Sequence, residues 1–155
     1  MTLLVGDAAP DFSATSDSGA TFTLSESLTR GPVALVFFPL AFSGRCQAEL
    51  CEIRDNIEVF SEEDVTVVGV SIDSHYSLAA WKAEQNYAFE LVSDRWPVGE
   101  ISRSYGVFLE EAGISNRATF LIDQEGILRW SVVTDPGTSR SLGGYREAIA
   151  DLVKS

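Results

Sequence analysis

The sequence predicts an α/β fold with a mixed β-sheet flanked by helices, and three observations lead to this prediction. Two continuous apolar runs, residues 33–38 (VALVFF) and 65–72 (VTVVGVSI), have the composition of strands that are covered on both faces. A helical pattern follows each run, which is the order of parallel strands joined by crossover helices. Residues 119–122 and 127–133 flank the turn at 123–126 and predict a terminal hairpin.

The other elements are predicted in chain order around these strands. Residues 20–24 alternate weakly and predict a short edge strand, as an N-terminal β extension. Apolar residues recur at helical spacing from Cys46 to Phe60, which predicts one helix there. The remaining predicted elements are helices at 77–86, 98–105 and 144–153 and a short strand at 89–92. This order is typical of the thioredoxin-like α/β sandwich.

Length and composition indicate one domain that spans residues 1–155. A chain of 155 residues fits a single core, and no repeat, linker or low-complexity tract divides it. The longest apolar run, residues 33–42, is broken by Pro39 and is about half as long as a membrane helix of roughly 20 residues. The first residues carry no positive charge and reach Asp7 early, unlike a secretory signal. We therefore expect a cytoplasmic protein with no membrane partner.

The balance of charge is the unusual feature of the composition. Asp and Glu number 23 against 11 Lys and Arg, which gives a net charge of -12. A negative field of this size repels nucleic acid and anionic membranes, so we expect neither as a partner. Only Lys82 and Lys154 are lysines. An acidic, lysine-poor surface suits a salt-rich cytosol, where charge is strongly screened, and it equally suits a protein kept soluble by its charge.

The two cysteines, Cys46 and Cys51, limit the chemistry that the chain can perform. Two cysteines in a cytosolic chain are rarely a structural disulfide. With His75 as the single histidine, they are too few for a zinc site of four Cys and His ligands. We give His75 no catalytic role and expect no metal. Redox chemistry and inert core thiols remain as the two interpretations.

Cys46 lies where a predicted buried strand gives way to the first turn of a helix. The unpaired N–H groups of a helix N-terminus carry a partial positive charge, which favours a thiolate over a thiol. Cysteines at such positions have pKa values lowered from about 8.5 to roughly 3.5–7.5, and the thiolate is the nucleophile. From placement alone, a reactive thiol and a buried, unreactive cysteine are equally good interpretations of Cys46.

The residues around Cys46 form a spaced motif, Pro39-x-x-x-Ser43-x-x-Cys46. This motif resembles the peroxiredoxin active-site pattern Pro-x-x-x-Thr/Ser-x-x-Cys at every defined position, and Glu49 matches an acidic residue common in that family three positions later. The wider stretch FFPLAFSGRCQAEL is most similar to the AhpE-type branch. A distant segment, NRATFLID, places Arg117 just before a buried strand, where thioredoxins usually carry a cis-proline. This segment also resembles peroxiredoxins, which have an arginine at the corresponding turn.

The resemblance implies a thiol-dependent peroxidase that reduces hydrogen peroxide and organic hydroperoxides without metal, haem or flavin. Cys46 would attack the peroxide and become a sulfenic acid, while Pro39 would shield the thiolate from water. The residues implied to bind the peroxide, through side chains or backbone N–H groups, are Ser43, Arg45, Glu49 and Arg117. The implied partners are the peroxide, a thiol reductant (a thioredoxin-like protein or a low-molecular-weight thiol) and a second copy of the chain in a homodimer.

Cys51 follows Cys46 by five residues in the same predicted helix. Five helical residues rise about 7.5 Å and turn about 140°. A disulfide usually needs Cα atoms within about 6.8 Å, so this pair can bridge only if the helix unwinds. The spacing resembles the bacterioferritin-comigratory-protein (PrxQ) branch, whose resolving cysteine lies here and which the AhpE-type branch generally lacks. We favour Cys51 as the resolving cysteine of an atypical 2-Cys enzyme. The alternative is a 1-Cys enzyme whose Cys46 is resolved by an external thiol.

Two other functions compete with the peroxidase interpretation. The first is a thiol–disulfide oxidoreductase on the same fold, although four residues separate Cys46 from Cys51 where such enzymes have Cys-x-x-Cys. The second is a binding or chaperone role in which Cys46 has no chemical part. Neither predicts a fast reaction with peroxide.

Overall fold

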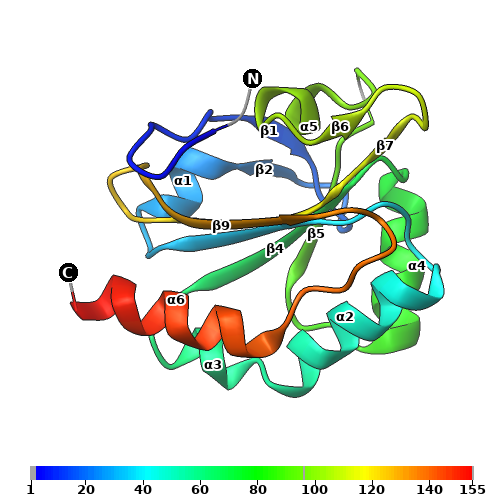
Figure 1. The fold of residues 1–155 in the computed structure, drawn as a ribbon. Coiled ribbons are helices and arrows are strands. Elements are labelled where there is room, and N and C mark those ends of the chain that lie inside the picture. The colour runs from blue at the N-terminus through cyan, green and yellow to red at the C-terminus, as the bar shows by residue number, and fades with distance from the viewer. Residues whose placement is uncertain (1–2, 96, 155) are drawn as a thin grey trace.

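The computed structural model describes residues 3–95 and 97–154 and contains a central five-stranded sheet in the order β5-β4-β3-β8-β9 (Figure 1). The five strands are β3 (Val33–Phe37), β4 (Thr66–Ser71), β5 (Glu90–Ser93), β8 (Arg117–Ile122) and β9 (Leu128–Thr134). β3, β4 and β5 are parallel, whereas β8 and β9 are antiparallel to their neighbours. The predicted mixed sheet, with its terminal hairpin, is therefore confirmed.

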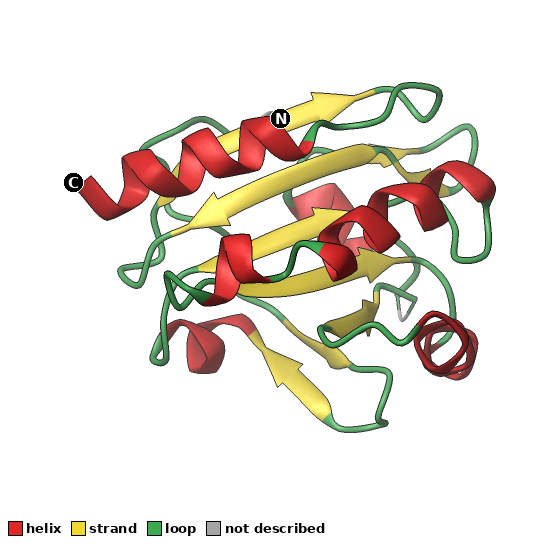
Figure 2. Ribbon diagram, turned by 90° about the horizontal axis from the view of Figure 1, so that it is seen from below, coloured by secondary structure: helices red, strands yellow, loops and turns green. Residues whose placement is uncertain are grey.

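Helices cover both faces of the sheet, as Figures 1 and 2 show. One face carries α2 (Gly44–Asp55), α3 (Glu58–Ser61), α4 (His75–Gln85) and α6 (Leu142–Lys154). The other carries α1 (Leu24–Leu28) and α5 (Glu100–Ser104), together with the small hairpins β1–β2 (Ser13–Thr15 and Thr21–Thr23) and β6–β7 (Phe108–Leu109 and Ile114–Ser115). No helix within the described ranges is both long and apolar enough to cross a membrane.

The cover on both faces of β3 explains why its sequence is continuously apolar. Side chains alternate between the two faces of a strand, so a strand covered on both faces needs apolar residues at every position. Val33, Leu35 and Phe37 lie in the core under α1 and α5. Ala34 and Val36 lie in the core under α2, α4 and α6, which also contains Cys46.

The prediction of one continuous helix from Cys46 to Phe60 is wrong. Helix α2 ends at Asp55 and α3 begins at Glu58. At the break, Asn56 leaves the helical region with φ −127°, and its side-chain amide donates to the carbonyl of Glu52 at 2.9 Å. Asn side chains compete for backbone partners in this way, which is why they are poor residues inside helices.

The N-terminal extension is confirmed, but not as an edge of the main sheet. Strand β2 pairs with β1 in a separate two-stranded sheet. The predicted strand also ran one residue too far, because Leu24 begins α1. Helix α1 and the β6–β7 hairpin were missed, since elements of two to five residues leave too short a pattern to recognise.

Helix α4 is fixed at both ends by local sequence signals. The Ser74 hydroxyl accepts from the backbone N–H of Ser77 at 3.2 Å, as an N-cap side chain does. Asn86 ends the helix in the left-handed region with φ 56°. The helix lies beside the Cys46 segment, where Trp81 Nε1 donates to Gln47 Oε1 at 3.1 Å.

Candidate active site

Cys46 is the third residue of α2 and is completely buried. The chain reaches it from β3 through a turn in which Phe42 has φ 67°, an unusual value for a residue with a side chain. The bond from Gln47 N–H to the Ser43 carbonyl, 2.9 Å long, begins the helical pattern. The N–H groups of the turn before it have no partner within the helix and point toward its N-terminal end.

Arg117 lies against the Cys46 sulfur. Its Nη1 donates to Cys46 Sγ at 3.2 Å, and the residue is only 3% exposed. The guanidinium is oriented by a second bond, from Nε to the Pro136 carbonyl at 2.8 Å. We expected Arg117 just before the strand, but it is the first residue of β8. The next residue of β8, Ala118, pairs with Phe37 of β3. This pairing brings a residue 71 positions away to the sulfur.

Glu49 lies one helical turn after Cys46 and shares the same arginine. Its Oε1 accepts from Arg117 Nη1 at 2.6 Å, and the side chain is 6% exposed. Burial opposes ionisation of this carboxyl, but the hydrogen bonds and charge of Arg140, together with the charge of Arg117, outweigh burial and lower the Glu49 pKa below its ordinary 4.5. The ionised carboxylate therefore fixes the guanidinium that faces Cys46.

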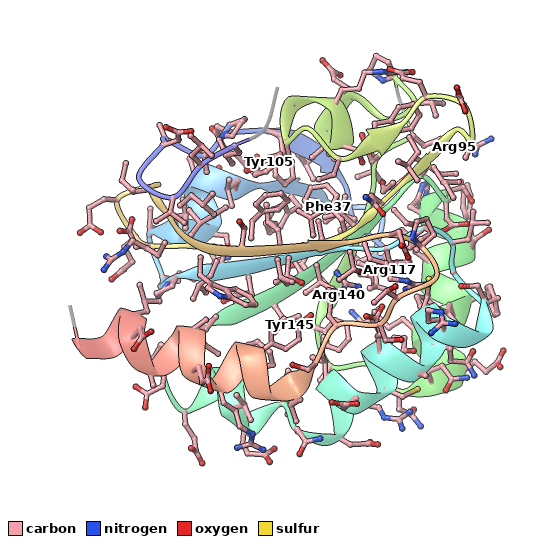
Figure 3. All side chains as sticks on the ribbon, in the orientation of Figure 1. Phe37, Arg95, Tyr105, Arg117, Arg140 and Tyr145 are labelled. Carbon is pink, nitrogen blue, oxygen red and sulfur yellow. The ribbon has the colours of Figure 1, made fainter. Side chains whose placement is uncertain are left out.

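Arg140 was missed by the sequence analysis and is the most extensively bonded side chain of the site. Its backbone N–H and its Nε donate to Glu49 Oε2 at 2.6 and 3.1 Å, and its Nη2 donates to Glu49 Oε1 at 2.9 Å. Its Nη1 reaches the carbonyls of Phe37 and Ala118, both at 2.8 Å. Figure 3 shows Arg140 and Arg117 near one another on the face of the sheet that carries α2 and α6.

The other residues predicted to form the peroxide site lie near Cys46 but make different contacts. Pro39 is buried in the loop that leads to α2. Ser43 occupies the N-cap position, yet its hydroxyl donates to the carbonyl of Leu40 at 2.9 Å and does not cap the helix. The Arg45 side chain is exposed and donates to the Ser139 hydroxyl at 3.3 Å. The roles of Pro39, Ser43 and Arg45 toward peroxide stay predictions.

The loop before Cys46 is tied to the end of β4. The backbone N–H of Ala41 donates to Asp73 Oδ2 at 2.8 Å. The same oxygen accepts from the Ser71 hydroxyl at 2.6 Å. The anchor thus holds Ala41, the residue immediately before Phe42 and its positive φ. Sequence reasoning missed Asp73, although an Asp directly after a buried strand is a recognisable signal.

Cys51 lies one and a half turns further along the intact helix α2. It is partly buried, and neither cysteine forms a disulfide. Its Sγ lies 3.4 Å from Gln85 Oε1 and 3.5 Å from the Tyr87 hydroxyl. The structure thus shows the folded, reduced arrangement in which the two sulfurs have separate partners.

The site unites a thiol, a helix N-terminus and a fixed guanidinium in a water-poor environment. Such an arrangement stabilises negative charge on sulfur and offers donors to charge that develops on a bound oxygen. Within residues 3–95 and 97–154, no group of three or more His, Cys, Asp and Glu is placed to hold a metal ion. On a thioredoxin-like sheet, this site defines a cysteine-based peroxidase.

Comparison with known proteins assigns the family. The AhpC/TSA family model matches residues 5–131, which is most of the chain. The chain therefore belongs to the AhpC/TSA family and is a peroxiredoxin, a thiol-dependent peroxidase.

Relatives and solved structures agree along nearly the whole length. Alkyl hydroperoxide reductase E of Mycobacterium tuberculosis is 39% identical over 150 residues, covering 97% of this chain and 98% of the relative. A chloroplastic 2-cysteine peroxiredoxin of Chattonella marina is 36% identical over 150 residues, covering 92% of this chain and 76% of the relative. The reduced 2-Cys peroxiredoxin of Plasmodium vivax superposes with a TM-score of 0.87 at 29% identity, over 97% of this chain and 82% of that one. Peroxidoxin BcpB of Mycobacterium tuberculosis superposes with a TM-score of 0.83 at 28% identity, over 97% of this chain and 96% of that one.

Proposed function

We propose that Cys46 is the peroxidatic cysteine and that the chain reduces hydrogen peroxide and organic hydroperoxides. The observation that carries this proposal is the 3.2 Å contact between Arg117 Nη1 and Cys46 Sγ at the N-terminus of α2. The Cys46 thiolate attacks one peroxide oxygen, so that an S–O bond forms and the O–O bond breaks. The sulfur is oxidised to a sulfenic acid, and the leaving alkoxide or hydroxide takes a proton and departs as alcohol or water.

Arg117 stabilises the thiolate and the oxygen on which charge develops. A guanidinium suits this task because several N–H donors are held in one plane and the charge is permanent. Both Glu49 oxygens are occupied by arginines, so we assign Glu49 and Arg140 to the positioning of Arg117 and not to direct contact with peroxide. We assign the donors for the peroxide to the first-turn N–H groups at Arg45 and Cys46 and to the Ser43 hydroxyl, whose single proton must first turn away from the Leu40 carbonyl. Pro39 shields the sulfur.

We propose that Cys51 resolves the sulfenic acid. The Cys51 sulfur attacks Cys46 Sγ, an S–S bond forms, and the S–O bond breaks. The hydroxide leaves as water with the proton that Cys51 gives up. Because α2 is intact between the two cysteines, its first turns must unwind before this step. A thioredoxin-like protein or a low-molecular-weight thiol then supplies two electrons to restore both thiols.

Counting thiols after one equivalent of hydrogen peroxide tests both assignments. Wild type is expected to lose two thiols, Cys51→Ser one and Cys46→Ser none. Loss of both thiols in wild type with intermolecular disulfides on a non-reducing gel would contradict intramolecular resolution. Loss of one thiol in wild type would favour the alternative, a 1-Cys enzyme resolved by an external thiol. Unchanged thiol loss in Cys46→Ser would remove Cys46 from the reaction.

The choice of peroxide is supported by the name of a relative. A protein 39% identical over nearly the full length is an alkyl hydroperoxide reductase. We therefore expect organic hydroperoxides to be accepted beside hydrogen peroxide. Rate constants for hydrogen peroxide and cumene hydroperoxide, measured on the same reduced sample, test this expectation. A reaction with hydrogen peroxide alone would contradict it.

We also propose that the protein is a cytoplasmic homodimer. A reducing compartment keeps both cysteines in the free form that peroxide reduction needs. Large apolar side chains are exposed beside the active-site loop and at the start of α4, namely Leu40, Phe42 and Tyr76. Light scattering should give twice the mass of the chain, and Tyr76→Asp should yield monomers. A monomeric wild type would contradict the dimer, and recovery outside the cytoplasm would contradict the location.

A further inference from the structure

We propose that Tyr87 is a positioning residue for the resolving step: its hydroxyl holds the Cys51 sulfur in the folded helix and so slows formation of the Cys46–Cys51 disulfide. This inference rests on the proposed function of Cys51. Tyr87 belongs to the loop between α4 and β5 and lies outside the site that binds peroxide. Its hydroxyl is 3.5 Å from Cys51 Sγ.

Besides the contacts of Cys46 and Glu49 with Arg117 and Arg140, the segment that must unwind makes a second set of contacts, with residues 73–87. Its start is held by the bond from Ala41 N–H to Asp73. In the middle, Trp81 Nε1 donates to Gln47 Oε1 at 3.1 Å. At the far end, Cys51 Sγ contacts Gln85 and Tyr87. Of this second set of contacts, the last involves a reacting sulfur directly.

The directions of the hydrogen bonds at Cys51 follow from its single proton. The thiol donates to Gln85 Oε1, which is an acceptor and has no hydrogen to give. The Tyr87 hydroxyl, 3.5 Å from the same sulfur, must then be the donor in the second contact. A hydroxyl directed at the sulfur lone pairs and a thiol directed at Gln85 hold Cys51 from two sides.

Tyr87 is fixed well enough to act as an anchor. The residue is 3% exposed, and its ring lies 5.1 Å from the rings of both Trp81 and Phe89. Burial, followed by the hydrogen bond with Cys51, raises the pKa of the Tyr87 phenol, so that it stays a donor at neutral pH. On the other side, Arg54 Nη1 donates to the Gln85 carbonyl at 2.7 Å and fixes the end of α4.

Disulfide formation requires Cys51 to lose these contacts. In the intact helix the two cysteines point in directions about 140° apart, and their Cα atoms are too distant for an S–S bond. Bringing the sulfurs together therefore separates Cys51 from Tyr87 and Gln85. Because these contacts exist only while the helix is folded, they stabilise the folded state and slow unwinding. Disulfide formation, which consumes the sulfenic acid, must wait for unwinding. The Tyr87 hydroxyl thus lengthens the lifetime of the sulfenic acid.

The lifetime of the sulfenic acid decides between two fates of Cys46. Attack by Cys51 gives the disulfide and water. Attack on a second peroxide forms another S–O bond, breaks another O–O bond and gives a sulfinic acid, which the reducing thiol does not restore. Slower resolution therefore makes the protein more sensitive to excess peroxide.

The test compares Tyr87→Phe with wild type, because Phe keeps the ring and removes the hydroxyl. Tyr105→Phe is the matched control, since Tyr105 is also buried, at 1% exposed, and its hydroxyl donates to the Pro10 carbonyl at 2.7 Å on the opposite face of the sheet. Tyr87→Phe should leave the rate of peroxide attack unchanged and speed disulfide formation roughly two- to tenfold, the range expected for one neutral hydrogen bond. The peroxide concentration that gives half sulfinic acid, measured by mass spectrometry, should rise by the same factor. Tyr105→Phe should match wild type in both measurements.

A second comparison separates this role from a general loosening of the fold. In a Cys51→Ala background, Tyr87→Phe should leave sulfinic acid formation unchanged, because the hydroxyl acts only through Cys51. An effect in that background, or disulfide formation as slow as or slower than wild type, would overturn the role of Tyr87 while leaving the resolving role of Cys51 intact. Failure of wild type to form any intramolecular disulfide would overturn the resolving role, and the role of Tyr87 with it.

Discussion

Arg140 holds the carboxylate of Glu49 with three N–H donors, although the two residues are 91 positions apart in the sequence. Glu49 in turn accepts from the same Arg117 nitrogen that donates to Cys46. The four residues form one connected chain from the interior of the sheet to the sulfur. The orientation of the arginine that contacts the Cys46 sulfur therefore depends on a buried ion pair, Glu49–Arg140, that does not touch the sulfur.

Replacing Arg140 with Met should destabilise the protein strongly. The substitution leaves the buried Glu49 carboxylate without its main partner, and breaking a buried pair in this way costs about 3–5 kcal/mol. Urea unfolding monitored by circular dichroism measures the loss. The control is Arg146→Met, an exposed arginine of α6, which should change the free energy of unfolding by less than about 0.5 kcal/mol. Equal stabilities for the two variants would contradict the role of Arg140.

Glu49→Gln should change how stability depends on pH. The Glu49 pKa is lower in the folded protein than its ordinary 4.5, so the ionised form contributes stability above that pH and the contribution is lost as the pH falls through the folded pKa. The free energy of unfolding of wild type minus that of Glu49→Gln should therefore be largest near neutral pH and should shrink below about pH 4.5. Ala48→Gln, at an exposed position of the same helix and without a titratable group in either form, should show a difference that does not vary with pH. A pH-independent difference for Glu49→Gln would contradict the lowered pKa.

Arg117→Met should slow the reaction of Cys46 with peroxide by roughly 10²-fold or more, the usual effect of removing one preorganised donor. The rate constant of Arg117→Lys should lie between those of Arg117→Met and wild type, because lysine keeps the charge but lacks the planar array of donors. Competition with a peroxidase of known rate measures these constants. A Lys variant as fast as wild type would show that charge alone suffices.

Asp73→Ala should destabilise the folded conformation of the loop that precedes Cys46. The substitution removes a hydrogen bond from Ala41 N–H to a charged acceptor, which is worth about 1.5–3 kcal/mol. With the anchor gone, Phe42 is expected to leave its positive φ, and peroxide attack should slow. Asp151→Ala, an exposed residue of α6, serves as the control for stability and rate. Unchanged values in Asp73→Ala would show that the anchor does not hold the loop.

The elements that sequence reasoning recovered are those with long patterns or local signals. Strand β3 shows a continuous apolar run, and the Pro39–Ser43–Cys46 motif lies within eight residues. These features depend on neighbours in the chain and are visible without a structure. Helix α1 and the β6–β7 hairpin are too short to show a period, and the break after α2 depends on a single Asn side chain.

The parts of the site that were missed depend on contacts across the sheet. Arg140 follows a loop and precedes the last helix, and nothing near it in the sequence distinguishes it from an exposed arginine. Its burial results from the pairing of β3 with β8, which exposes the Phe37 and Ala118 carbonyls to its guanidinium. Likewise, the contact of Cys51 with Tyr87 spans 36 positions and depends on how α2 packs on α4.

The most direct test of the central claim is stopped-flow tryptophan fluorescence of the reduced protein mixed with hydrogen peroxide, beside Cys46→Ser. Trp81 bonds to Gln47 of α2, and its ring lies 6.1 Å from that of Phe42, so its emission should respond to changes at Cys46. We predict a rapid phase whose rate rises in proportion to peroxide and which is absent in Cys46→Ser. A wild type that reacts no faster than a free thiol would contradict the assignment of Cys46 as the peroxidatic cysteine.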